Sequence, residues 1–208
     1  MMEQYETEEQ QVEAIKRFWK ENGLALVIGA ILGLGGLLGW RYYNDSQIEA
    51  KEQASFAYEK SSENLLKGEI GFSQAKMFID NYSGTGYAML MALELSQQAI
   101  ERKDLTEAAK QLEFVANNAK LSAVQSVAQI RLARIQIEQG EFEQALASAD
   151  KVTDQAFNSQ SQEVRGDVYK AQQLFDKARA AYSAALETNA SDQVLKMKLD
   201  NLAIAANG

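Results

Sequence analysis

Cysteine and histidine are both absent from this 208-residue sequence. Their absence excludes a thiolate nucleophile, an imidazole base and every metal site built from those two residue types. Carboxylates remain as candidate catalytic groups, but acids such as Glu138, Glu141 and Glu143 have the spacing of a solvated helix face. Gly68 and Gly71 lack the Lys-Ser/Thr ending of a phosphate-binding loop. We therefore expect no enzyme, no cofactor and no bound metal.

Proline is absent as well, and no run of alternating β-branched residues appears. The chain beyond its N-terminal part is rich in Ala, Gln, Glu, Leu and Lys, which is a helical composition. Basic residues are outnumbered, at 21 against 29 acidic ones. Because a phosphate-binding surface needs clustered Lys and Arg, nucleic acid is not an expected partner.

Charge is missing altogether from the 19 residues between Asn22 and Trp40, those two included. A helix of that length spans about 28 Å, close to the roughly 30 Å thickness of a bilayer's hydrocarbon core. Trp19 and Trp40 stand at the two ends of this stretch, and Tyr42 and Tyr43 follow it. Aromatic residues of this kind gather at headgroup level. The pattern predicts one transmembrane helix in a lipid bilayer.

The alternatives to a membrane anchor are a buried core helix and a cleaved signal peptide. A buried helix of a soluble core rarely lacks polar side chains around its whole circumference. A cleaved signal peptide has a short basic segment before the apolar run and small residues after it. Here the segment up to and including Asn22 is 22 residues long and contains six acids. An uncleaved membrane anchor is therefore the favoured interpretation.

The basic residues that flank the apolar stretch predict its orientation. They are Lys16, Arg17 and Lys20 before it and Arg41 after it. Because Lys and Arg close to a span stay on the cytoplasmic side, the N-terminus is expected in the cytoplasm. We expect a cytoplasmic segment over 1–22, a transmembrane helix over 23–43 and a domain over 44–208 across the membrane.

Small residues recur every four positions within the span. Ala25, Gly29 and Gly33 form one such row, and Gly35 and Gly39 form another. Rows of this kind allow a second helix to approach closely in lipid, so we expect them to pack against a partner helix or to support a homodimer. Glycine is also generally frequent in membrane helices, and that alternative stays open.

A repeat runs through the remainder of the chain. Its four copies align at Phe72-Ser73-Gln74-Ala75, Leu105-Thr106-Glu107-Ala108, Phe142-Glu143-Gln144-Ala145 and Phe175-Asp176-Lys177-Ala178. The alanines lie 33, 37 and 33 residues apart, near the 34 of a tetratricopeptide unit. Further expected packing residues of the third and fourth copies are Gly140, Gly166, Tyr169 and Tyr182. The fold is therefore expected to be all-α, with one transmembrane helix and about four tetratricopeptide-like hairpins.

Some positions depart from the tetratricopeptide pattern, so a generic helical bundle remains the alternative. The terminating proline is absent, Glu63 occupies a position for a small residue, and the 37-residue interval predicts a longer turn over 117–121. The expected helices cover 11–67, 72–81, 86–102, 105–117, 122–139, 142–153, 161–173 and 175–188. A final helix, capped by Ser191, is expected to close the stack with Val194, Met197, Leu199 and Leu202.

The sequence resembles the YfgM family, the ancillary subunits of the bacterial SecYEG translocon. The resemblance is carried by the run from Tyr5 to Gly23, by Gly39-Trp40-Arg41-Tyr42, by Arg131-Leu132-Ala133-Arg134 and by Lys198-Leu199-Asp200-Asn201-Leu202. It implies a single-pass protein of the bacterial inner membrane with a periplasmic tetratricopeptide-like domain. It also implies three partners, namely the SecYEG translocon, the membrane-anchored periplasmic chaperone PpiD and unfolded client proteins.

Two functional hypotheses follow. In the first, a membrane-tethered module binds a partner protein beside the translocon. In the second, the span forms homodimers and the chain is a self-assembling scaffold or tether of the envelope. Tyr87, Met89 and Met91 are candidates for a binding face, although their helical spacing favours the core.

Overall fold

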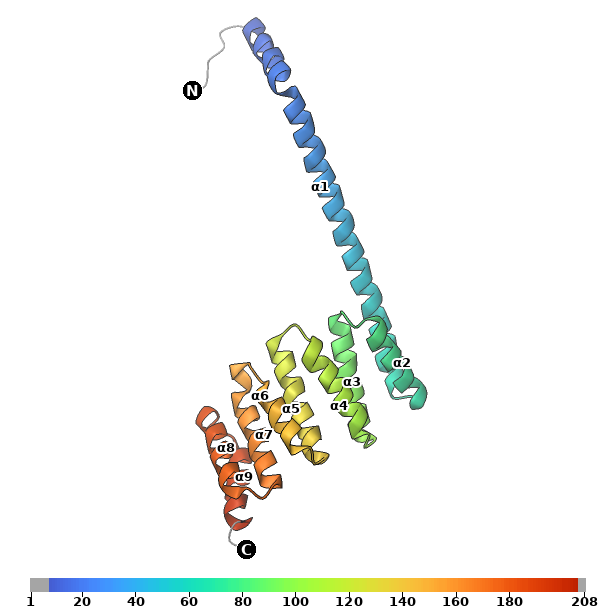
Figure 1. Cartoon of the computed structure of the whole chain (residues 1–208). Helices are drawn as coiled ribbons and strands as arrows, with labels where there is room; N and C mark the ends of the chain where they lie inside the picture. The colour runs from blue at the N-terminus through green and yellow to red at the C-terminus, as the bar shows by residue number, and fades with distance from the viewer. Residues whose placement is uncertain (1–7, 206–208) are drawn as a thin grey trace. The chain divides into compact units, whose positions relative to one another are not determined.

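The structure is a computed structural model that describes residues 8–205, and all regular elements within that range are helical (Figure 1). The helices are α1 (Glu8–Leu65), α2 (Glu69–Asn81), α3 (Gly86–Glu101), α4 (Leu105–Asn118), α5 (Ser122–Glu138), α6 (Phe142–Asp150), the short 3₁₀ helix η1 (Gln155–Phe157), α7 (Asn158–Ala171), α8 (Phe175–Thr188) and α9 (Gln193–Ala205). The predicted all-α fold class is confirmed.

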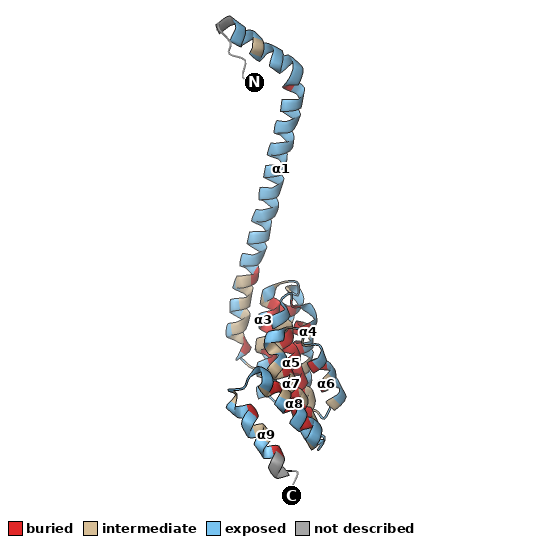
Figure 2. Ribbon diagram, turned by 90° about the vertical axis from the view of Figure 1, so that its left-hand side faces the viewer, coloured by how far each residue is buried: buried red, intermediate tan, exposed pale blue. Residues whose placement is uncertain are grey.

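The chain divides into two compact units, one up to Gln53 and one from Ala54 onward. The first unit contains the apolar part of α1, which among the described residues is the helix long and apolar enough to cross a membrane. Its most apolar window is not buried inside the protein, and the ribbon of this part of α1 has the pale blue of exposed residues in Figure 2. The buried-core interpretation is therefore wrong, and this helix presents its apolar side chains outward.

The second unit is an array of helical hairpins. Each α-helix from α2 to α8 packs against the α-helix that follows it in the chain. The end of α1 contacts α2 through the rings of Tyr58 and Phe78, and the hairpins α3–α4, α5–α6 and α7–α8 follow, with α9 against α8 (Figure 1). We call α3, α5 and α7 the first helices and α2, α4, α6 and α8 the second helices. This arrangement is the predicted tetratricopeptide-like array with a closing C-terminal helix.

One alanine in each second helix lies at the centre of the packing. Ala75, Ala108, Ala145 and Ala178 all have no solvent-exposed surface. A larger side chain would hold the neighbouring helices apart, since helix axes separated by about 8–10 Å leave room for only small residues where ridges cross. The regular spacing of these alanines along the sequence therefore reflects repeated close contact between helices.

Three of the connecting turns share one backbone conformation. Lys103, Gly140 and Gln173 have positive φ angles of 63°, 78° and 60°. At each turn the N–H of the following residue donates to the carbonyl five residues earlier, at 2.8 Å. This geometry ends a helix with a left-handed residue, which suits Gly140 and costs about 1 kcal/mol for a lysine or a glutamine. The recurring turn therefore joins the two helices of the hairpins α3–α4, α5–α6 and α7–α8 in the same way.

Several predicted boundaries need correction. Helix α2 begins at Glu69 instead of residue 72, because the turn before it is made at Gly68 and lacks the shared geometry. The longer turn predicted over 117–121 is wrong, because α4 continues to Asn118 and α5 begins at Ser122. The extra residues lie in α4, which extends about one helical turn further beyond Ala108 than α2 extends beyond Ala75. Helix α6 ends early, at Asp150, and η1 precedes the start of α7 at Asn158.

The final helix is capped and packed differently from the prediction. Asp192, not Ser191, caps α9, because its carboxylate accepts the backbone N–H groups of Val194 and Leu195 at 2.9 and 3.1 Å. Val194 and Met197 are 53% and 57% exposed and do not close the stack. Leu195 is buried instead of them, and Leu202 is buried as predicted. The predicted end of this helix at Ala206 lies outside the described residues.

Candidate functional site

The small residues of the apolar segment lie on open surface. A Cβ atom added at Gly29, Gly33, Gly35 or Gly39 would meet no atom within 4 Å. Ala25 is exposed too. This face can therefore accept another helix without rearrangement of the chain itself. Its packing against a partner helix stays a prediction.

The predicted repeat-packing residues occupy defined places in the hairpins. Phe72 is buried, and the guanidinium of Arg102 lies 3.8 Å from the centre of its ring. Leu105, Phe142 and Phe175, at the start of the other second helices, are half-buried. They pack at the edges of the buried clusters. Each therefore contributes to the contact between successive hairpins.

Gly166 and Tyr182 form one close contact between α7 and α8. A Cβ at Gly166 would lie nearer than 3.0 Å to the Tyr182 ring, a separation that real Cβ atoms do not adopt. The ring itself is fully buried. Only glycine leaves room for this aromatic side chain, so the two residues depend on each other.

A network of charged groups, the terminal polar cluster, surrounds the hydroxyl of Tyr182. It consists of Arg134, Glu163, Asp167, Tyr182 and Lys198. Tyr182 donates to Asp167 at 2.7 Å, and the Lys198 ammonium donates to Asp167 and to Glu163 at 2.7 Å each. Arg134 pairs with Glu163 at 3.4 Å. Four helices, α5, α7, α8 and α9, are thereby joined by one set of partly buried ion pairs.

A second network, the anchor cluster, joins the end of α1 to α3. Tyr58 and Ser62 both donate to the carboxylate of Glu94, the latter at 2.8 Å. The Tyr58 ring lies 5.6 Å from the Tyr87 ring and 6.1 Å from the Phe78 ring, measured between centres. Tyr87 and the buried Met89 and Met91 therefore belong to the core, as their spacing favoured.

Burial and neighbouring carboxylates shift the ionisation of both tyrosines. Burial, followed by the hydrogen bond to Glu94 and its charge, raises the pKa of Tyr58 from 10.0 to about 12. Burial also raises the pKa of Tyr182, with the Asp167 hydrogen bond and the charges of Asp167 and Glu163 adding to it. Both phenols therefore stay protonated in alkaline solution.

This shift predicts a loss of stability at high pH. A folded-state pKa above the unfolded value contributes stability that is complete below pH 10.0 and lost as the pH rises through about 12. Ultraviolet absorbance of phenolate should show Tyr58 and Tyr182 ionising only well above pH 10. A Tyr58→Phe variant should lack one late-titrating group. If the group that Tyr58→Phe removes ionised near pH 10 in the folded protein, the prediction would be contradicted.

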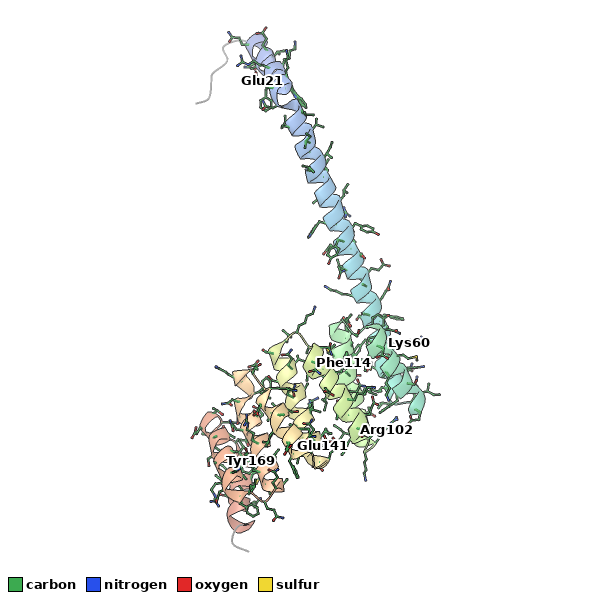
Figure 3. The ribbon with its side chains drawn as sticks, viewed as in Figure 1. Glu21, Lys60, Arg102, Phe114, Glu141 and Tyr169 are labelled. Carbon is green, nitrogen blue, oxygen red and sulfur yellow. The ribbon has the colours of Figure 1, made fainter. Side chains whose placement is uncertain are left out.

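A shallow groove of about 300 Å³ lies between α7 and α8. It is lined by Gln162, Arg165, Tyr169, Lys177, Ala180, Ala181 and Ala184. Tyr169, which Figure 3 labels, is one of the predicted repeat-packing residues. The lining contains no carboxylate, so the groove offers no acid pair for general acid–base chemistry. Within the described part of the chain, no group of three or more His, Cys, Asp or Glu residues could hold a metal ion.

Sequence reasoning missed the residues that join distant segments. Tyr58 and Glu94 lie 36 positions apart, and no pattern in the sequence relates them. Glu163 and Asp167 are four positions apart and so share one helix face, a signal that could have suggested a cation opposite them. The sequence around Gly71 also gives no sign of close packing, although a Cβ at this position would lie nearer than 3.0 Å to the backbone of Asn64.

An exposed apolar helix joined to an array of helical hairpins defines a membrane-anchored repeat protein, a class that acts through protein contacts. The model of the tetratricopeptide repeat-like domain family matches residues 16–204. Ancillary SecYEG translocon subunits are similar over nearly the whole chain. That of Escherichia coli (strain K12) is 34% identical over 207 residues, covering 98% of this chain and 100% of the relative. Those of Haemophilus influenzae and Neisseria gonorrhoeae are 30% and 31% identical, and each comparison covers 94% of this chain and 97% of the relative.

The chain therefore belongs to the family of ancillary SecYEG translocon subunits. The family resemblance inferred from the sequence is confirmed. The match extends through the apolar segment and all four hairpins, so it includes both units of the fold.

Proposed function

We propose that this chain is a membrane-anchored ancillary subunit of the SecYEG translocon that binds other proteins through its helical repeats. The observation that carries the proposal is the similarity to relatives of that name over nearly the full length of this chain. The exposed apolar helix supplies the anchor, and the array supplies a large protein-binding surface without needing catalytic chemistry.

The proposed topology places residues 1–22 in the cytoplasm, 23–43 in the inner membrane and 44–208 in the periplasm. The basic residues ahead of the apolar segment support this orientation. The periplasmic array would then meet polypeptides that leave the translocon. Its partners would be the chaperone PpiD and unfolded client segments, consistent with what the family resemblance implies.

Photo-crosslinking from the spanning segment tests the proposal. A crosslinker at Gly29 or Gly33 should capture translocon or chaperone peptides, identified by mass spectrometry. Leu34 is the matched control, because at 100° per residue it lies away from both rows of small residues. Equal capture from Leu34 would argue against a specific helix contact. Recovery of neither translocon nor chaperone peptides from any position would contradict the proposal.

Two further measurements separate the alternatives. The mass of the full chain in mild detergent should be that of a monomer, whereas a stable dimer without translocon contacts would favour the scaffold hypothesis. A reporter fused after Gly208 should be active only in the periplasm. Activity in the cytoplasm would reverse the proposed orientation.

A further inference from the structure

The groove between α7 and α8 follows a second helix that is shorter than the others. Helix α6 has nine residues, whereas α4 has 14. Counted back from the repeat alanines, Arg165 in α7 corresponds to Leu95 in α3 and Leu132 in α5. Those two leucines are buried in the core, but Arg165 is partly exposed. The same relation holds for Gln162, which corresponds to the buried Ala92 and Gln129. The fourth hairpin therefore keeps open a surface that the earlier hairpins cover.

The chemistry of this surface differs from that of the rest of the chain. Two cations, Arg165 and Lys177, line it, although the whole chain has a net charge of −8. The guanidinium of Arg165 pairs with Asp150, and its Nε is buried without a hydrogen-bond partner. The Lys177 ammonium lies 5.7 Å from the centre of the Tyr169 ring, and no ion pair holds it within the described residues. The Lys177 ammonium can therefore still donate to an added acceptor, whereas the Arg165 guanidinium is shared with Asp150.

The floor of the groove consists of small side chains. Ala180, Ala181 and Ala184 of α8 face it. Alanines at this spacing let a polypeptide backbone approach a helix closely. The acids Glu163 and Asp167 of α7 belong to the terminal polar cluster and do not line the groove. None of the lining residues is an acid, and the carboxylate beside the groove is that of Asp150, which pairs with Arg165.

We propose that this groove binds a short acidic segment of another polypeptide. The carboxylates of that segment lie between Arg165 and Lys177, and its backbone lies on the alanines of α8. Charge complementarity supplies the specificity, because a basic segment would be repelled by the same two cations. The inference rests on the proposal that the array binds other proteins, and it names the chemical class of the bound segment and its place on α7 and α8.

Binding of a labelled hexaglutamate peptide to the full chain in non-ionic detergent tests this inference. Fluorescence anisotropy at low salt should show tighter binding of hexaglutamate than of hexalysine. The exposed position of Ala180 and the free ammonium of Lys177 allow substitution without disturbing the core. Lys177→Gln should weaken hexaglutamate binding about threefold, and the double variant with Ala180→Glu should weaken it about tenfold.

Lys110→Gln is the matched control, since it removes one exposed positive charge from α4, away from the groove. It should bind hexaglutamate like the unmodified chain. Equal losses from Lys110→Gln and Lys177→Gln would overturn the groove as the site, as would equal binding of hexalysine. Crosslinking of the spanning segment reports on the translocon proposal independently, so failure of the peptide assay alone would leave that proposal standing.

Discussion

Replacement of Tyr182 by alanine is expected to lower the free energy of unfolding by about 3–5 kcal/mol. The ring is fully buried between Gly166 and the final helices, so its loss leaves a cavity. The hydroxyl donates to Asp167, which Lys198 also contacts. Removal of both the ring and the hydroxyl therefore loosens the attachment of α9 as well. Denaturant unfolding, followed by circular dichroism, measures the change.

Tyr182→Phe separates the ring from its hydroxyl. This variant keeps the buried ring and loses one hydrogen bond, so it should cost about 1 kcal/mol. Lys198 still supplies a donor to Asp167 and limits the loss. If the phenylalanine and alanine variants were equally destabilised, the packing of the ring against Gly166 would not be the dominant contribution.

Replacement of Gly71 by alanine is expected to cost about 3 kcal/mol, at the upper end of overpacking effects. The added Cβ would lie nearer than 3.0 Å to the carbonyl oxygen of Asn64. That oxygen belongs to the backbone at the end of α1, so no side-chain rotation relieves the clash. The first hairpin must open or shift, and thermal unfolding should show the loss.

Gly86→Ala is the matched control for this prediction. A Cβ at Gly86 would meet nothing within 4 Å, and the residue begins α3. Alanine is favoured over glycine in a helix by up to about 1 kcal/mol, so this variant should be neutral or slightly more stable. If Gly71→Ala were as stable as Gly86→Ala, the start of α2 would not lie as close to the end of α1 as it does in the structure.

The repeats could be predicted from the sequence because they depend on local spacing. Ala75, Ala108, Ala145 and Ala178 recur at nearly constant intervals, and each occupies the same buried place in its hairpin. Gly140 marks a turn that Lys103 and Gln173 make without glycine. The sequence therefore indicated the positions of these turns through the residues that follow them, even where glycine itself is missing.

Other features could not be predicted from spacing. The 37-residue interval was assigned to a turn, although the extra residues extend α4, because helix and turn lengths exchange without changing the interval. Val194 and Leu195 are adjacent apolar residues, and only the packing of α9 decides that Leu195 is buried. Helix α6 ends early, at Asp150, and no residue type at its C-terminus indicates that end.

The amino-acid sequence alone determined that this protein has an apolar helix of membrane-spanning length, no cysteine or histidine chemistry and a helical repeat of tetratricopeptide length. These properties follow from composition and from periodicity within short segments. The tertiary structure alone decided which ions pair and which surface stays open. Tyr58 meets Glu94 and Lys198 meets Asp167 across 36 and 31 positions, since stacking of successive hairpins brings distant residues together. Such contacts depend on the length of every intervening helix.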